Sequence, residues 1–155
     1  MRRTDKEIAS REEIEAIIRR STVCRLGLVD EGRPYIVPLA FGYKGNALYF
    51  HSAPIGRKME ILRRNPEVCF ELDTDAEPVP AGAACGWTMR YRSVIGYGTV
   101  SFLESIAEKK TALSFIMGQY TNGAFEFPDE SVREIAVFRL EIREMVGKKS
   151  GHKSE

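Results

Sequence analysis

The residues best suited to chemistry lie in the segment 49–58, which reads Tyr-Phe-His-Ser-Ala-Pro-Ile-Gly-Arg-Lys. An apolar run ends there in His51 and Ser52, a glycine-containing loop follows, and Arg57 and Lys58 open a helical pattern. Backbone N–H groups and the helix dipole favour an anion at a helix start. Arg57 can hold a phosphate through two parallel hydrogen bonds, Lys58 adds a point charge, and Ser52 adds a donor. The segment therefore suits a terminal phosphate, or else it is an ordinary solvated helix start.

A second candidate is the apolar segment 33–41, which contains Pro38. Proline has no N–H to give to a strand ladder, so Pro38 indicates an edge strand, a bulge or a strand end. Backbone groups of its neighbours would then be free to meet a flat heteroaromatic ring with amide-like edges. The simpler interpretation is an edge strand that binds nothing.

A third candidate is the segment 87–98, which ends in Gly96-Tyr97-Gly98. This pair of glycines is not a dinucleotide fingerprint, because the third glycine is absent and no helix follows directly. Both glycines fall on one face of a predicted strand, where they allow a bend or a close approach. Arg90, Tyr91 and Ser93 could reach a bound ligand from this strand, or they could form an exposed strand face.

Other kinds of chemistry find little support. His51 and His152 are the only histidines, and Cys-x-x-Cys and His-x-x-x-His spacings are missing, so no metal site is predicted. A Gly-x-Ser-x-Gly motif for a serine hydrolase is also missing. The formal net charge of +1 argues against a nucleic-acid partner.

The composition indicates one globular domain over residues 1–155, with 43% hydrophobic and 29% charged residues. The N-terminus lacks the apolar region of a signal peptide, and no apolar run approaches the roughly 20 residues that span a bilayer. Cys24, Cys69 and Cys85 are widely spaced and odd in number, which is typical of reduced thiols. We therefore expect a cytoplasmic protein without a membrane partner.

The elements that must position these segments are mostly short strands. Apolar alternation and Gly-containing turns predict strands over residues 23–30, 34–43, 47–52, 68–72, 89–103 and 135–142. Helices are predicted over residues 11–20, over residues 57–65, and after a second capping residue, Ser105. The segments 73–86 and 121–133 are expected to be irregular, and the tail 147–155 is expected to be flexible.

These elements favour a mainly β fold, a closed or nearly closed antiparallel β-barrel of six strands with short flanking helices. A doubly wound parallel sheet would need a helix between most strands.

Taken in order, the segments resemble the FMN-binding split-barrel superfamily of pyridoxamine 5'-phosphate oxidase, and most closely its nitroimidazole-resistance branch. The matching features are Pro34-Tyr35-Ile36-Val37-Pro38-Leu39, then Tyr49 to Ala53 with Gly56-Arg57-Lys58, then Asn65-Pro66-x-Val68, then Tyr91-x-Ser93-Val94-Ile95 with Gly96-x-Gly98. The resemblance covers about residues 8–145.

The resemblance implies an FMN site at the interface of a two-fold homodimer. Arg57 and Lys58 would grip the FMN phosphate, with His51 and Ser52 beside it. The residues implied along the isoalloxazine edge, through their backbone, are Ile36, Val37, Pro38 and Leu39. Those implied at a site shared with the partner chain are Tyr91, Ser93 and Val94.

The chain departs from the true oxidase at its C-terminal end, Gly-Lys-Lys-Ser-Gly-His-Lys, which lacks the Arg- and His-bearing motif for the pyridoxal substrate. Oxidation of pyridoxamine phosphate is therefore not expected. The resemblance implies instead an FMN-dependent oxidoreductase that reduces a small acceptor such as a nitroaromatic. His51 would donate a proton to the substrate or, more simply, orient the loop or the phosphate.

Two alternatives from other classes stay open. One is a heme-binding or heme-degrading protein on the same barrel, with His51 or another residue as the iron ligand. The other is a non-enzymatic flavin carrier or sensor, which would bind FMN without turnover.

Overall fold

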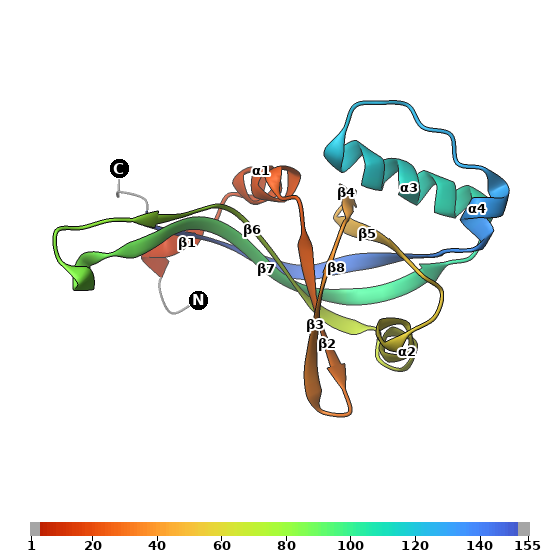
Figure 1. Cartoon of the computed structure of the whole chain (residues 1–155), viewed down its shortest axis with the longest axis horizontal. Helices are drawn as coiled ribbons and strands as arrows, with labels where there is room; N and C mark the ends of the chain where they lie inside the picture. Colours follow the sequence, from red (N-terminus) through yellow and green to blue (C-terminus); the bar gives the residue numbers. More distant parts are fainter. Residues whose placement is uncertain (1–3, 152–155) are drawn as a thin grey trace.

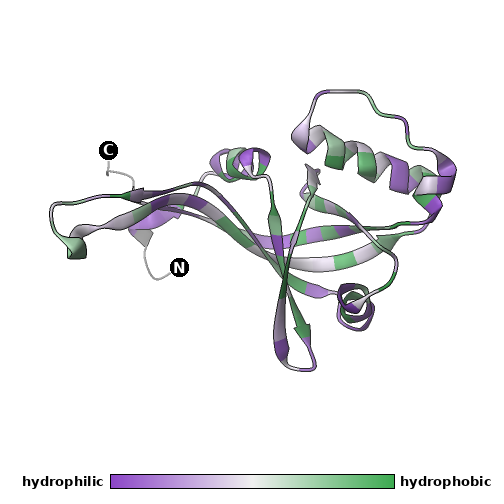
Figure 2. Cartoon of the chain, viewed as in Figure 1, coloured by the Kyte–Doolittle hydropathy of each residue, from purple (hydrophilic) through white to green (hydrophobic). Residues whose placement is uncertain are grey.

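Alternation of apolar and polar residues builds the strands, because successive side chains of a strand point to opposite faces. In the strand Cys24–Asp30, the buried residues Cys24, Leu26 and Leu28 alternate with more exposed neighbours. Figure 2 shows hydrophobic and hydrophilic segments alternating along the strands. The hydrophobic faces turn inward and form the core of the barrel.

The computed structural model describes residues 4–151. Its strands are β1 (Glu7–Ile8), β2 (Cys24–Asp30), β3 (Arg33–Leu39), β4 (Gly42–Lys44), β5 (Ala47–Ser52), β6 (Glu67–Val79), β7 (Thr88–Leu103) and β8 (Ala136–Ser150). Its α-helices are α1 (Arg11–Arg20), α2 (Arg57–Arg64), α3 (Ile106–Tyr120) and α4 (Asp129–Arg133), and short 3-10 turns lie at Thr4–Lys6 and Ala84–Gly86.

The strands form one antiparallel sheet in the order β3-β2-β6-β7-β8-β5-β4, with β1 paired to β8. The sheet curls so that the β2–β3 hairpin, β4 and β5 lie around the centre of the molecule, with α2 below and α3 above in this view (Figure 1). The first part of β7 and the last part of β6 leave this barrel as a long ribbon, along which the last part of β8 also pairs with β7. The predicted mainly β split barrel with short flanking helices is confirmed.

The strand count is eight rather than the predicted six. The predicted strand 34–43 is divided at Ala40 and Phe41 into β3 and β4. The added strand β1 pairs with β8 at Lys148 and Gly147. The division separates a strand that pairs with β2 from a strand that pairs with β5. The strand β1 depends on pairing with a distant segment, which local alternation does not reveal.

Two segments that were expected to lack structure are strands. Residues 73–79 continue β6, and the register shift between Thr74 and Glu77, with φ +59° at Asp75, marks a bulge in the ribbon. Residues 147–150 belong to β8 rather than to a flexible tail, because they pair with β7 and β1. Because these residues are polar, as suits an exposed ribbon, the sequence pattern does not indicate that they form a strand. Residues 152–155 lie outside the described part.

Predicted helix starts agree well with the structure. Ser10 caps α1 by accepting a hydrogen bond from the N–H of Glu13 at 3.3 Å. Ser105 and Glu108 form the predicted capping box of α3. Within the segment 121–133, expected to be irregular, the last five residues form the short helix α4.

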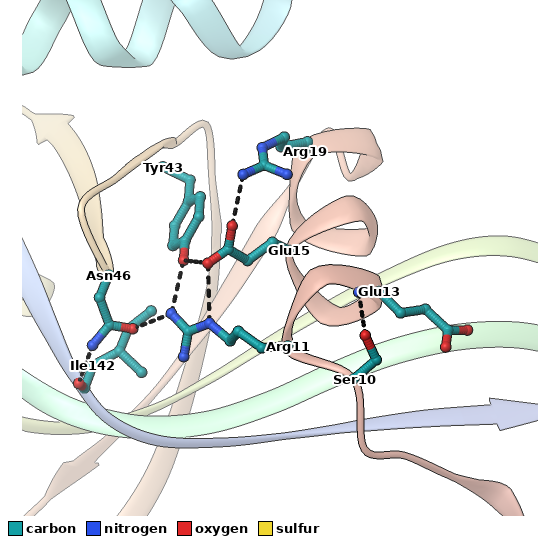
Figure 3. Close-up of polar contacts among 8 residues, drawn as sticks. All are labelled: Ser10, Arg11, Glu13, Glu15, Arg19, Tyr43, Asn46 and Ile142. Carbon is teal, nitrogen blue, oxygen red and sulfur yellow. Dashed lines mark hydrogen bonds and ion pairs between the residues drawn. The ribbon is translucent and has the colours of Figure 1, made fainter.

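A polar cluster fixes α1 against the turn between β4 and β5 (Figure 3). Arg11 Nη2 donates to Tyr43 Oη at 3.0 Å and to Asn46 Oδ1 at 2.6 Å, while its Nε donates to Glu15. Asn46 in turn donates from Nδ2 to the carbonyl of Ile142 in β8 at 3.0 Å. The cluster therefore joins three elements, and its groups satisfy one another rather than facing a ligand.

The helix α3 covers β4 and β5 at close range. A Cβ added at Gly42 would lie 2.4 Å from the backbone carbon of Phe115, so only glycine permits this approach. At the end of α3, Tyr120 Oη accepts from the N–H of Phe41 and donates to the carbonyl of Thr22, both at 2.9 Å. The helix thereby fixes the segment between β3 and β4, next to the candidate site.

Candidate functional site

The site is built around the start of α2, where Gly56 occupies the N-cap position with φ +114° and ψ 168°. This region of backbone space is essentially restricted to glycine. The Gly56 carbonyl accepts from the N–H groups of Met59 and Glu60, so the helix begins with its first-turn N–H groups pointing outward. Buried Met59, Ile61 and Leu62 anchor the helix to the barrel core.

Arg57 is held in place by the β2–β3 hairpin. Its Nε donates to Asp30 Oδ2 at 3.1 Å, and its guanidinium carbon lies 4.5 Å from the centre of the Tyr35 ring. The other carboxylate oxygen of Asp30 accepts from Arg64 Nη2 at 2.8 Å. The hydrogen bonds from Arg57 and Arg64 hold the pKa of the Asp30 carboxyl below its usual range. Asp30 is thus an anion between two arginines.

Lys58 differs from Arg57 in having no partner within the described part of the chain. It is half-buried, and that burial lowers the pKa of its ammonium group. Among residues 4–151 no hydrogen bond or ion pair to its Nζ is found. A partly desolvated cation without an anion is an unfavourable arrangement. An anion bound at the start of α2 would relieve it.

His51 and Ser52 end β5 four residues before α2, as predicted. They pair with Val137 and Ala136 of β8, with His51 exposed and Ser52 half-buried. Their position in the chain brings them to the same end of the barrel as Arg57. The exposed imidazole is free to meet a ligand.

The predicted edge strand is confirmed, since β3 ends the sheet and pairs only with β2 among the described strands. Its free side leaves main-chain N–H and C=O groups without strand partners over residues 36–39. Ile36 and Pro38 are exposed, whereas Val37 and Leu39 turn partly inward against the core. The predicted role of this edge in binding a flat ligand through its backbone stays a prediction.

The residues predicted on β7 do not join the others within one chain. Two strands, β2 and β6, separate β3 from β7, and the first part of β7 lies in the ribbon far from α2 (Figure 1). Val94 is fully buried in the core and Ser93 is 7% exposed. Tyr91 is half-buried, with Lys148 Nζ 5.5 Å from the centre of its ring. Their predicted role in a shared site stays a prediction.

The outward face of the sheet carries exposed apolar side chains that sequence alternation alone does not explain. Ile36 is 65% exposed on β3, and the paired strands continue this face to Ile95, Tyr97 and Val146, each between 42% and 49% exposed. A groove of about 290 Å³ runs between β7 and β8 on this face, beside Ile95, Tyr97 and Val146. We call this set of four residues the outward apolar face.

Sequence reasoning missed Asp30 as a site residue. The pair Glu31-Gly32, both with positive φ, forms a tight hairpin turn that leaves Asp30 at the end of β2. The turn was visible in the sequence as Glu31-Gly32-Arg33. Its approach to α2 depends on the closure of the barrel and was not visible.

Over residues 4–151, no three histidine, cysteine or acidic side chains gather in a way that could hold a metal ion. None of the helices in this part of the chain is both long and apolar enough to cross a bilayer.

Fold and site together define a split β-barrel protein with two adjacent cations, Arg57 and Lys58, at the start of α2, and with a free strand edge at β3. Residues 10–149 match the family of pyridoxamine 5'-phosphate oxidase. The chain therefore belongs to the pyridoxamine 5'-phosphate oxidase family, as its motifs suggested.

Three individual proteins illustrate the likeness. The structure of a candidate 5-nitroimidazole antibiotic resistance protein from Bacteroides thetaiotaomicron VPI-5482 is 38% identical, with a TM-score of 0.84 over 92% of this chain and 86% of that chain. An FAD- and heme-binding protein from Mycobacterium smegmatis is 19% identical, with a TM-score of 0.86 over 97% and 76%, which shows the shared fold alone.

The third protein is a curated sequence relative, uncharacterized protein RA0666 of Rhizobium meliloti strain 1021. It is 35% identical over 65 residues. That match spans only 42% of this chain and 42% of the relative.

Proposed function

We propose that this protein binds FMN and passes electrons from the reduced flavin to a small acceptor such as a nitroaromatic compound. The observation that carries the proposal is Lys58, a half-buried cation with no partner among residues 4–151. It lies at a helix start whose outward N–H groups and neighbouring Arg57 suit a phosphate dianion. The similarity to the candidate 5-nitroimidazole resistance protein supports the choice of acceptor.

The groups around the site fit each part of the cofactor. The start of α2 would bind the phosphate, with Ser52 as a further donor. The free edge of β3, at Ile36, Val37, Pro38 and Leu39, would meet the polar edge of the ring through main-chain groups. A bound flavin supplies the electron or hydride transfer itself.

The chain's own residues would then bind and orient the flavin and protonate the acceptor. The barrel edge would hold the ring so that one side stays open to the acceptor. His51 is exposed at the end of β5, and its imidazole would give a proton to a reduced oxygen atom of the acceptor. Its simpler role would be to orient the loop 53–56 that leads to α2.

We further propose a homodimer with the cofactor sites at its interface. The outward apolar face is the support for this assembly, because exposed apolar side chains gathered on one sheet face mark an interaction surface. The face includes Ile36 on the proposed flavin edge and extends to β7. A second copy could therefore bring Tyr91 and its neighbours to the site.

We also propose a cytoplasmic location, which the three free cysteines support.

The test is the visible spectrum of the purified protein, followed by anaerobic reduction with a reduced nicotinamide cofactor and addition of a nitroimidazole. Flavin bands that bleach on reduction and recover with the nitro compound would support the proposal. A Soret band would favour heme binding. Flavin bands that no acceptor restores would favour the carrier or sensor alternative.

A further inference from the structure

We infer that Asp30 is a positioning residue for the phosphate site, holding Arg57 with its two terminal nitrogens directed at the phosphate. The inference rests on the proposed function. It adds an anionic residue from the β2–β3 hairpin to a site whose cationic groups lie on α2.

The hairpin presents Asp30 to α2 by its register. Leu28 pairs with Tyr35, and Asp30 lies two residues beyond Leu28 on the same face of the hairpin. Leu28 is fully buried in the core, whereas Asp30 lies past the core where α2 packs. Asp30 and Tyr35 therefore reach Arg57 from one rigid surface.

The contacts on Arg57 use the parts of the guanidinium that a phosphate does not need. Asp30 Oδ2 takes the Nε–H, and the Tyr35 ring covers one face of the guanidinium plane. The two Nη groups keep their donors, and two parallel N–H groups are what a phosphate accepts. Without Asp30 the long side chain, 55% exposed, would lose this orientation and would have to be ordered by the ligand.

Arg64 keeps Asp30 itself in place. It donates from Nη2 to Oδ1 at 2.8 Å, while Arg57 takes Oδ2, so the carboxylate is fixed from both sides. The same carboxylate carries a negative charge near a site meant for an anion. The orientation of Arg57 by Asp30 should strengthen phosphate binding, whereas the negative charge of Asp30 should weaken it. A test has to separate these two effects on affinity.

Two variants with equal charge make that separation. Asp30→Asn keeps an acceptor oxygen for Arg57, whereas Asp30→Ala removes it, and both lose the negative charge. Dissociation constants are measured by quenching of flavin fluorescence, with FMN and with riboflavin, which lacks the phosphate. The same pair of variants is then made in an Arg57→Met background.

The expected result is that the Ala variant binds FMN about tenfold more weakly than the Asn variant, with riboflavin affinity equal in both. In the Arg57→Met background the difference between Asn and Ala should vanish. Equal FMN affinities of the two variants, or an equal loss for riboflavin, would overturn the inference while leaving the proposed function intact. A protein that binds no flavin with Asp30 unchanged would overturn both.

Discussion

The guanidinium of Arg57 lies 4.5 Å from the centre of the Tyr35 ring, a contact that joins the start of α2 to the edge strand β3. An exposed cation–π contact of this kind contributes about 0.5–1 kcal/mol. It also places the proposed phosphate-binding cation directly beside the proposed flavin edge.

Replacing Tyr35 should therefore weaken FMN binding through Arg57. We expect Tyr35→Leu to raise the dissociation constant of FMN about twofold to fivefold, and Tyr35→Phe to leave it nearly unchanged, because phenylalanine keeps the ring. Fluorescence titration of both variants measures the effect. Equal losses in the two variants would show that the hydroxyl, rather than the ring, matters.

The unusual environment of Lys58 predicts a pH dependence. Burial lowers the pKa of its ammonium in the free protein, and a phosphate dianion beside it would raise that pKa again. FMN affinity should therefore be constant while Lys58 stays charged in both states, and should fall as pH rises through the pKa of the free protein.

The measurement is the FMN dissociation constant between about pH 7 and pH 9.5, where the phosphate remains a dianion. The matched control is Lys58→Arg, whose guanidinium keeps its charge over this range, so its affinity should stay flat. An identical decline in the lysine and arginine proteins would place the titrating group elsewhere.

The backbone at Gly56 predicts a stability effect. A side chain at φ +114° and ψ 168° is strained, so Gly56→Ala should lower the free energy of unfolding by about 1–3 kcal/mol. Gly82→Ala is the control, since an added Cβ there has no neighbour within 4 Å. Urea unfolding measures the free energy of unfolding of both variants. Equal values for the two variants would show that a side chain at position 56 is not strained.

If the outward apolar face forms the proposed dimer interface, its disruption should separate the two chains. Tyr97→Asp places a charge on this face and should give monomers in sedimentation equilibrium. Phe125→Asp changes an equally exposed aromatic residue in the loop after α3 and should leave the dimer intact. A dimeric Tyr97→Asp protein would move the interface to another surface.

Features that depend on neighbouring residues in the sequence could be predicted, whereas features that depend on contacts between distant segments could not. The start of α2 and the edge position of β3 were predictable from local residues. Gly56 permits the backbone conformation that begins the helix, and Pro38 has no N–H group to donate to a second strand. The strand character of residues 73–79 and 147–150 was not, because it depends on pairing with distant strands.

The site shows the same limit. Arg57 was recognisable from its neighbours in sequence, but its partner Asp30 lies 27 residues away and meets it only after the barrel closes. The predicted residues on β7 carry chemistry suited to a ligand, yet Ser93 and Val94 are buried within their own chain. Alternation could not tell an exposed strand face from a buried one at that point.

The central claim is that the corner formed by Arg57 and Lys58 binds the phosphate of FMN. Its most direct test is to measure the affinities for FMN and for riboflavin in the unchanged protein and in the double variant Arg57→Met, Lys58→Met. We predict that the unchanged protein prefers FMN strongly, and that the double variant loses at least about a hundredfold in FMN affinity while its riboflavin affinity hardly changes. Equal affinities for the two flavins in the unchanged protein, or FMN binding that survives the double substitution, would contradict the account.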